Sequence, residues 1–331
     1  MNPDRSLQFF SASDVSTALP MKDAVEAMKG VFLELSSGNA CVPPRTHVAI
    51  PEHAGDALFM PSYSPNMGRM GLKVVTLHPK NRELGLPFIQ ALVMVLDAVT
   101  GTPLAVMNGA ALTAIRTGAA SGAATDVLAR EDASQVAIFG AGVQAETQLE
   151  AVCSVRAIRR VTVFDISTER AEAFAAKMQE SLHVEVNAMA DSAAALAGAD
   201  VVCTATTSEI PVFADAEIAS GTHINAIGSY KPHVREIPPD TVARACVVVD
   251  QVEAAWEEAG DLIMARDEGV IEESHIQTEL GQVIAGDKSG RQNDEQITFF
   301  KSVGVATQDL AAACAVLEKG ESLGLGTRVE L

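Results

Sequence analysis

The sequence is short of positive charge. Lysine and arginine together number 24, against 43 aspartates and glutamates, which gives a formal net charge of −19. A surface that negative repels phosphodiester backbones and anionic lipid headgroups. Nucleic acids and membrane surfaces are therefore not expected partners, and a small molecule is the expected ligand.

Paired cysteines and long apolar runs are also missing. The five cysteines are scattered, odd in number and never spaced as CxxC, so the sequence predicts neither a disulfide framework nor a zinc site. No stretch approaches the roughly 18 apolar residues of a membrane span, and the first ten residues hold no apolar signal core. We expect a cytoplasmic protein with reduced thiols and no bound metal.

The apolar content is high enough for large cores, at 48% of 331 residues, and the length suits two domains. The first 40 residues have apolar positions at helical spacing, with Ser13-Asp14 as an N-cap and Gly38 as the end. Residues 42–107 contain short apolar runs punctuated by prolines, and a turn at 99–102 predicts a hairpin. This segment predicts a small antiparallel sheet after a helix.

The middle of the chain alternates apolar strands with helices. QVAIFG, RVTVFD, DVVCT, THINAI and CVVVD are apolar on both faces, and segments of helical character separate several of them. That pattern indicates a doubly wound parallel α/β sheet of the Rossmann type. We expect the last helix, 306–319, to be amphipathic and to pack on the first domain. The predicted division is 1–118 with 305–331 for a substrate and dimerisation domain, and 119–304 for a dinucleotide-binding domain.

A glycine-rich loop stands between a predicted strand and a predicted helix. It reads Gly140-Ala141-Gly142-Val143-Gln144-Ala145, where glycines allow a tight turn and close approach of backbone N–H groups to a pyrophosphate. The next strand ends in Asp165, whose carboxylate suits a ribose 2′-hydroxyl and favours NAD(H) over NADP(H). Arg170, which is close to Asp165 in the sequence, weakens this preference for NAD(H). A glycine-rich turn with Asp165 as a helix cap is the structural alternative.

Three basic residues are placed among apolar neighbours. Arg45 follows two prolines, Lys73 lies in an apolar strand, and Arg116 lies in a helix of small residues. Taken singly, they read as a strand-edge charge, a snorkelling lysine and a surface arginine. Together they suit a small carboxylate, because arginine binds carboxylates with two parallel hydrogen bonds and lysine adds a point charge or a proton.

Other polar residues suggest structural roles. His78 and His223 read as packing or turn residues, Asp250 as a cap at a strand end, and the acidic run 253–261 as a solvated helix face. The sequence has no HExxH pattern and no Ser-His-Asp arrangement. Hydrolytic and cysteine nucleophile chemistry therefore have no support.

Seven short blocks follow one another along the sequence: Gly71-Leu72-Lys73, His78-Pro79-Lys80-Asn81, Gly101-Thr102-Pro103-Leu104-Ala105, Thr113-Ala114-Ile115-Arg116-Thr117, Gly140-Ala141-Gly142-Val143-Gln144, Thr222-His223-Ile224-Asn225-Ala226-Ile227-Gly228 and Ser302-Val303-Gly304. With these blocks in this order, the sequence resembles the ornithine cyclodeaminase/μ-crystallin family over nearly its whole length. The resemblance implies a homodimer whose chains each contain a Rossmann domain. It implies one of four functions: cyclodeaminase, amino acid dehydrogenase, imino acid reductase or nucleotide-dependent ligand binder.

The resemblance also implies site residues, position by position. Arg45, Lys73 and Arg116 match the residues that bind the substrate carboxylate and act in catalysis, with Tyr230 and Val303 beside the substrate. The implied cofactor-binding residues are Thr117, Gly140, Ala141, Gly142, Val143, Gln144, Asp165, Thr206, Ala226, Ile227, Gly228 and Ser302. The implied cofactor is NAD(H), with NADP(H) as the alternative.

Two departures from the family pattern narrow the reaction. Cyclodeaminases carry a catalytic aspartate just after the block that here ends in Gly228, and this sequence has Tyr230 there. A threonine that they use near the cofactor aligns with Phe88. Both differences favour an NAD(P)H-dependent reductase of a small cyclic 2-imino acid, Δ1-pyrroline-2-carboxylate or its six-membered homologue. Ornithine cyclodeamination, amination of a 2-oxo acid and ligand binding without catalysis are the alternatives.

Replacing Lys73 with methionine is expected to abolish imine reduction and to leave NADH binding nearly intact. Lysine is the expected source of the proton that the imine nitrogen requires, or it orients the water that supplies it, with Tyr230 a weaker candidate. Turnover and NADH titration of the variant measure the two effects. A variant that keeps more than about a tenth of the wild-type rate would show that Lys73 does not have this role.

Overall fold

The computed structural model describes residues 6–330, which form two compact units. Unit 1 comprises the N-terminal segment up to Arg116 together with Val305 onward, and unit 2 runs from Thr117 to Gly304. The first boundary lies two residues before the one expected from the sequence. Within the described part of the chain, no helix is long and apolar enough to cross a membrane.

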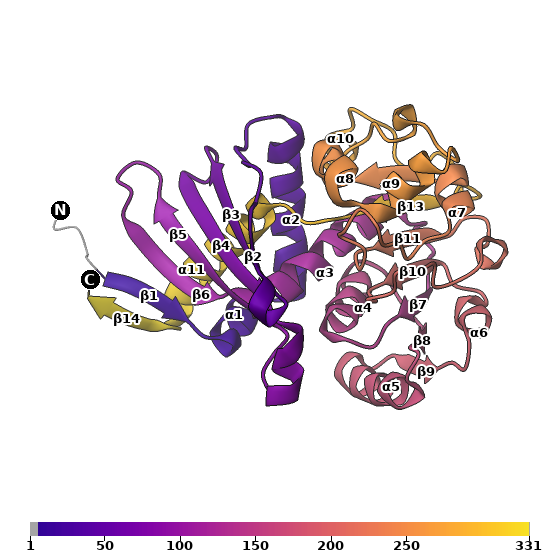
Figure 1. The fold of residues 1–331 in the computed structure, drawn as a ribbon, viewed down its shortest axis with the longest axis horizontal. Coiled ribbons are helices and arrows are strands. Elements are labelled where there is room, and N and C mark those ends of the chain that lie inside the picture. Colours follow the sequence, from indigo (N-terminus) through magenta and orange to yellow (C-terminus); the bar gives the residue numbers. More distant parts are fainter. Residues whose placement is uncertain (1–5, 331) are drawn as a thin grey trace. The chain divides into compact units, whose positions relative to one another are not determined.

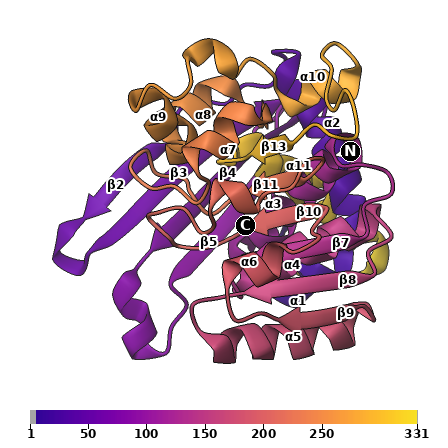
Figure 2. The same ribbon diagram turned by 90° about the vertical axis from the view of Figure 1, so that its right-hand side faces the viewer.

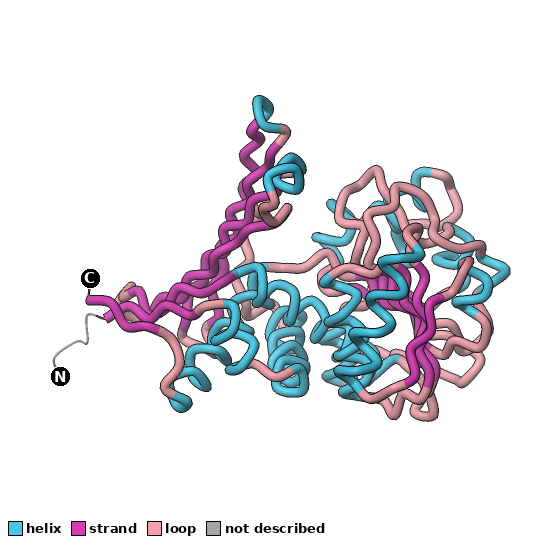
Figure 3. Tube along the Cα trace, turned by 90° about the horizontal axis from the view of Figure 1, so that it is seen from below, coloured by secondary structure: helices cyan, strands magenta, loops and turns pink. Residues whose placement is uncertain are grey.

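Unit 1 is a sheet with helices along one side of its strands (Figures 1 and 3). Its elements are β1 (Ser6–Phe10), α1 (Ala12–Ala18), α2 (Met21–Ser36), β2 (Thr46–Ile50), η1 (Pro51–His53), β3 (Gly55–Ser64), β4 (Arg69–Leu77), η2 (Pro79–Leu84), β5 (Ile89–Asp97), β6 (Pro103–Asn108), the first part of α3 (Gly109–Leu128), α11 (Ala306–Leu323) and β14 (Thr327–Glu330). In the described residues the strand order is β14-β1-β6-β5-β4-β3-β2.

Several predictions for the N-terminal third are confirmed, and others are wrong. The hairpin joining β5 to β6 is present, but β1 pairs with β6 in parallel, so the sheet is not purely antiparallel. The N-cap of the first helix is Ser11, not Ser13-Asp14. The Ser11 hydroxyl accepts the Asp14 N–H, and the Asp14 carboxylate accepts the Ser11 N–H, which forms a capping box.

Strand alternation gives the sheet of unit 1 two distinct faces. Lys73 on β4 is paired with Met60 on β3 and with Val93 on β5, and all three are buried. Because neighbouring residues point to opposite faces, the next row, Phe59, Val74 and Leu92, lies on the other face.

Helix α11 covers the Lys73 face and packs against β3, β4 and β5. Gly71, two residues before Lys73 on the same face, allows this approach. A Cβ at Gly71 would lie 3.1 Å from Leu310 Cδ1. The expected amphipathic character of α11 is wrong for its first two thirds, where residues from Ala306 to Leu317 are buried almost without interruption.

Unit 2 is a parallel sheet with helices on both sides (Figures 2 and 3). Its elements are the rest of α3, β7 (Gln135–Phe139), α4 (Val143–Val155), β8 (Arg160–Phe164), α5 (Thr168–Leu182), β9 (Glu185–Ala188), α6 (Ser192–Leu196), β10 (Val201–Thr204), η3 (Asp215–Glu217), β11 (His223–Ala226), α7 (Pro239–Arg244), β12 (Cys246–Val249), α8 (Val252–Glu258), α9 (Gly260–Asp267), η4 (Glu273–His275), α10 (Leu280–Ala285) and β13 (Thr298–Lys301). The described strands follow the order β12-β13-β11-β10-β7-β8-β9.

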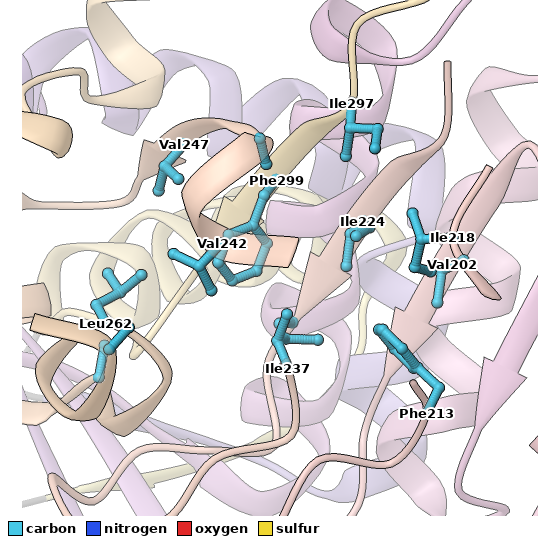
Figure 4. Packing of buried hydrophobic residues seen from close by; sticks show 14 of the residues in the cluster. Val202, Phe213, Ile218, Ile224, Ile237, Val242, Val247, Leu262, Ile297 and Phe299 are labelled. Carbon is cyan, nitrogen blue, oxygen red and sulfur yellow. The ribbon is translucent and has the colours of Figure 1, made fainter. Parts of the chain in front are cut away.

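The apolar residues of β7 explain why helices pack on both faces of this sheet. Val136 and Ile138 belong to the cluster that α4 and α5 bury, whereas Ala137 and Phe139 belong to the cluster on the opposite face. Figure 4 shows part of that second cluster, in which Phe299 of β13 packs among aliphatic side chains. The predicted doubly wound parallel sheet is confirmed.

Candidate active site

Unit 1 contains a buried ionic cluster on three elements. Lys73 Nζ lies 2.7 Å from Asp309 Oδ2, and Arg116 Nε donates to Asp309 Oδ1 at 3.0 Å. Arg116 Nη1 also donates to Gln308 Oε1 at 2.8 Å. All four side chains are buried, so two cations share one carboxylate away from water. The structure brings Lys73 and Arg116 together and adds two residues of α11 that the sequence analysis missed.

Arg45 is associated with the same cluster. Thr46 pairs with Phe59 and Met60 pairs with Lys73, so the backbone register extends the Lys73 row toward Arg45, just before β2. The Arg45 charge is close enough to lower the pKa of Lys73. The three basic residues predicted from the sequence therefore act on one region of unit 1.

The ionisation of the cluster is set by burial and by its own charges. Burial lowers the pKa of Lys73 to about 8; Asp309 opposes this shift, and Arg116 adds to it. Burial pushes the pKa of Asp309 upward, but Arg116 and Lys73 outweigh it and hold that pKa below its usual value. The cluster thus has an ionised carboxylate and a net positive charge, which is suited to a substrate anion.

The glycine loop of unit 2 has the geometry that a phosphate-binding turn needs. Gly140 follows β7 with φ of +95°, and a Cβ there would lie 2.7 Å from the Ala205 carbonyl oxygen, so glycine is required. A Cβ at Gly142 would meet only the Arg170 guanidinium, at 3.9 Å. The space before Gly142, the N-cap of α4, is therefore open to a ligand.

Two of the predicted nucleotide-binding side chains, Gln144 and Asp165, lie beside the loop. Gln144 Oε1 is buried and has no hydrogen-bond partner among residues 6–330. Both Asp165 oxygens accept backbone N–H groups, from Ala141 and from Ser167, each at 2.9 Å. Asp165 Oδ2 also lies 3.5 Å from Arg170 Nη2, and that arginine is largely exposed. Asp165 therefore connects the glycine loop to the end of β8.

The other predicted nucleotide residues surround a buried glutamate. Glu236 accepts hydrogen bonds from the Thr204 hydroxyl, from both the N–H and the hydroxyl of Thr206, and from the Gly228 N–H, at 2.7–2.9 Å. Four donors match a carboxylate, although burial and the nearby Asp261 raise the pKa of Glu236. Glu236 thus fixes the segments after β10 and β11 to one another.

Asp261 supports this glutamate from α9. Its Oδ1 accepts the N–H groups of Glu236 and Ile237, and its Oδ2 lies 2.8 Å from Lys301 Nζ. Asp261 and Lys301 are fully buried. The expectation of a solvated helix face is therefore wrong at Asp261, because a buried lysine needs a counter-ion.

The remaining predicted residues of unit 2 occupy defined positions. Asp250 Oδ2 accepts the Ser302 hydroxyl at 2.8 Å and the N–H of Val303 at 3.0 Å, so it positions the segment after β13. The Thr117 carbonyl accepts the Gln148 side chain. Tyr230 is 37% exposed in the segment after β11, where Ala226 ends the strand and Ile227 donates its N–H to the Thr204 carbonyl.

The glycine loop, Asp165 and the segments after β10, β11 and β13 all lie at the carboxyl edge of a parallel sheet. This arrangement defines a Rossmann dinucleotide-binding domain. The chain belongs to the ornithine cyclodeaminase/mu-crystallin family, whose model matches residues 6–323.

Comparison with known proteins identifies close relatives over the full length. A Δ1-pyrroline-2-carboxylate reductase of Bacillus cereus (strain ZK / E33L) is 40% identical over 97% of this chain and 98% of the relative. The Thermococcus litoralis Δ1-pyrroline-2-carboxylate reductase, solved in complex with NADH and L-proline, is 43% identical with a TM-score of 0.94, covering 98% and 100% of the two chains. An archaeal alanine dehydrogenase dimer with bound NAD is 35% identical, with a TM-score of 0.92 and coverage of 98% and 99%.

Replacing Gly228 with alanine is expected to lower the free energy of unfolding by about 1–3 kcal/mol. The added Cβ would lie 2.4 Å from the Thr206 carbonyl oxygen and 2.5 Å from both Glu236 carboxylate oxygens. Urea denaturation followed by far-UV circular dichroism, which reports on the helices of both units, measures the change. Gly30→Ala is the control, because a Cβ at this helical glycine meets nothing within 4 Å. Equal losses in the two variants would contradict the crowding argument.

Proposed function

We propose that this protein is an NAD(P)H-dependent reductase of a small cyclic 2-imino acid, with Δ1-pyrroline-2-carboxylate, reduced to L-proline, as the first candidate. The six-membered homologue is the second candidate. The observation that carries this proposal is the buried cluster of Lys73 and Arg116, in which two cations share the single carboxylate of Asp309. A net positive charge buried inside so acidic a protein suits a carboxylate-bearing substrate.

The residues of unit 1 would bind and protonate the substrate. Arg116 and Arg45 hold its carboxylate, which fixes the orientation of the imine carbon and nitrogen. Lys73 supplies the proton to the ring nitrogen. With a pKa of about 8, the lysine is largely protonated at neutral pH and is a stronger acid than an ordinary lysine.

The residues of unit 2 would hold the nicotinamide nucleotide, which supplies the hydride when bound. The open space at Gly142 fits a phosphate group, and the unsatisfied Gln144 Oε1 can accept a hydrogen bond from a hydroxyl or amide group of the nucleotide. Ala141 and Val143 complete the loop, and Asp165 suits an NAD(H) ribose. Arg170, exposed beside Asp165, leaves NADP(H) as a weaker alternative.

The far side of the same nucleotide site is assigned to the segments after β10, β11 and β13. These carry Thr206, Ala226, Ile227, Gly228 and Ser302. In the same proposal, Thr117 contacts the nucleotide, and Tyr230 and Val303 contact the substrate. The support is that buried carboxylates, Glu236 and Asp250, hold the three segments in fixed positions.

The purified protein is expected to oxidise NADH in the presence of Δ1-pyrroline-2-carboxylate, with NADH preferred over NADPH. Two control reactions are run beside it: pyruvate with ammonia and NADH, and ornithine with NAD, assayed for released ammonia. Ammonia release from ornithine would overturn the argument from Tyr230 and make the protein a cyclodeaminase. Faster NADH oxidation with pyruvate and ammonia would make it an alanine-dehydrogenase-type enzyme. Tight NADH binding without any turnover would identify a binder.

We also propose a homodimer through the open face of the unit 1 sheet. Phe59 and Leu92 are 37% and 57% exposed, and they lie on the face opposite Lys73, on either side of Val74. Val48, Tyr63 and Ile89 add exposed apolar side chains to the same sheet. Apolar surface of this kind is typical of an interface, and the archaeal alanine dehydrogenase relative is a dimer.

Sedimentation equilibrium is expected to give about twice the 34.7 kDa of one chain. The double variant Phe59→Lys/Leu92→Lys should sediment as a monomer, because it places charges in the apolar row. Val99→Lys, at an exposed turn outside that row, is the control and should stay dimeric. A wild-type protein that sediments as a monomer would refute the dimer.

A further inference from the structure

Helix α11 contributes two polar residues to the buried cluster of unit 1. Gln308 and Asp309 stand among apolar neighbours, and their exposed fractions are 0% and 1%. Burying an amide and a carboxylate is costly unless each finds partners. Asp309 has two partners, Lys73 and Arg116, but Gln308 has a partner for only half of its amide.

The orientation of the Gln308 amide follows from its partner. Arginine has only donors, so the amide atom that faces Arg116 Nη1 at 2.8 Å must be the oxygen. The amide nitrogen therefore points elsewhere, and it is buried with no hydrogen-bond partner among the described residues. An unsatisfied N–H donor on the amide that contacts the Arg116 guanidinium is suited to donate to an anion.

We propose that α11 completes the carboxylate site of the reductase: Gln308 is a further ligand of the substrate carboxylate through its Nε2, and Asp309 is a positioning residue that holds the Lys73 ammonium and the Arg116 guanidinium in place. This inference deepens the proposed function and rests on it for the identity of the substrate.

Asp309 acts through charge as well as position. The charged groups that act on Lys73 are Asp309 from α11, Arg116 from α3 and Arg45 before β2, and its neighbours on β3 and β5 are apolar. Asp309 is therefore the single anion among these groups. Without it, burial and two cations would act unopposed on the ammonium, which would lose its proton at lower pH.

The Asp309→Asn variant tests the positioning role through the pH profile of kcat/KM for Δ1-pyrroline-2-carboxylate. The protonated lysine is the active form, so wild-type kcat/KM should fall as the pH rises through about 8. In the variant this fall should move to lower pH by about one unit or more. Thr307→Val is the matched control: it is isosteric, lies on the same buried helix and should leave the profile unchanged. An unshifted profile in Asp309→Asn would overturn the positioning role.

The Gln308→Leu variant tests the ligand role by a different measurement. The imino acid KM and the Kd for L-proline, measured by calorimetry with NADH present, should each rise about tenfold. The Kd for NADH should stay at its wild-type value. The pH at which kcat/KM falls on the alkaline side should stay there as well. Unchanged KM and proline Kd would refute the ligand role.

Failure of the inference and failure of the proposed function give different results. A wild-type protein that binds L-proline but never reduces the imine refutes the reductase and leaves the Gln308 test intact. If Asp309→Asn does not fold, the double variant Lys73→Met/Asp309→Asn removes one cation with the anion and should restore NADH binding. A double variant that stays unfolded would show that Asp309 does not act by neutralising Lys73.

Discussion

Burial of two cations around one carboxylate is the constraint on which unit 1 depends. Lys73 and Arg116 lie in the interior, and the Asp309 carboxylate is the counter-ion that both of them contact. An uncompensated buried charge costs about 3–5 kcal/mol. The ion pairs tie α11, from the end of the chain, to β4 and α3. They add to the apolar packing that places the last helix in the first unit, and they leave the cluster a net positive charge that suits a substrate anion.

Unit 2 also depends on buried charged groups that find partners, but here the central groups are carboxylates and not cations. Glu236 is buried, and its four hydrogen bonds come from the last residue of β10 and from the segments that follow β10 and β11. Asp261 and Lys301 neutralise one another behind it. Asp250 accepts hydrogen bonds from Ser302 and Gly304 and so fixes the segment after β13. Fully satisfied carboxylates can therefore hold three irregular segments rigid at the carboxyl edge of the sheet, where a nucleotide site requires fixed backbone geometry.

Much of the fold could be predicted because its signals are local. Apolar strands such as 135–140, glycines at 140 and 142 and the spacing to Asp165 depend only on nearby residues. The errors arose where distant segments decide the structure. Strand β1 pairs in parallel with β6, nearly a hundred residues away, and no local pattern signals that partner. The acidic run that contains Asp261 predicts a solvated face because it is polar, whereas Lys301, the counter-ion of the buried Asp261, lies on a strand distant in the sequence.

The sequence by itself determined the two-part organisation, the Rossmann class of the sheet, the glycine loop after β7 and the three basic residues suited to a carboxylate. Each of these follows from periodicity, glycine placement or an isolated charge in an apolar segment. Only the tertiary structure decided which anion faces Lys73 and Arg116, which half of the Gln308 amide remains unsatisfied and which glutamate fixes Thr206 to Gly228. Charge pairing and hydrogen bonding depend on distance in space, and sequence separation does not encode that distance.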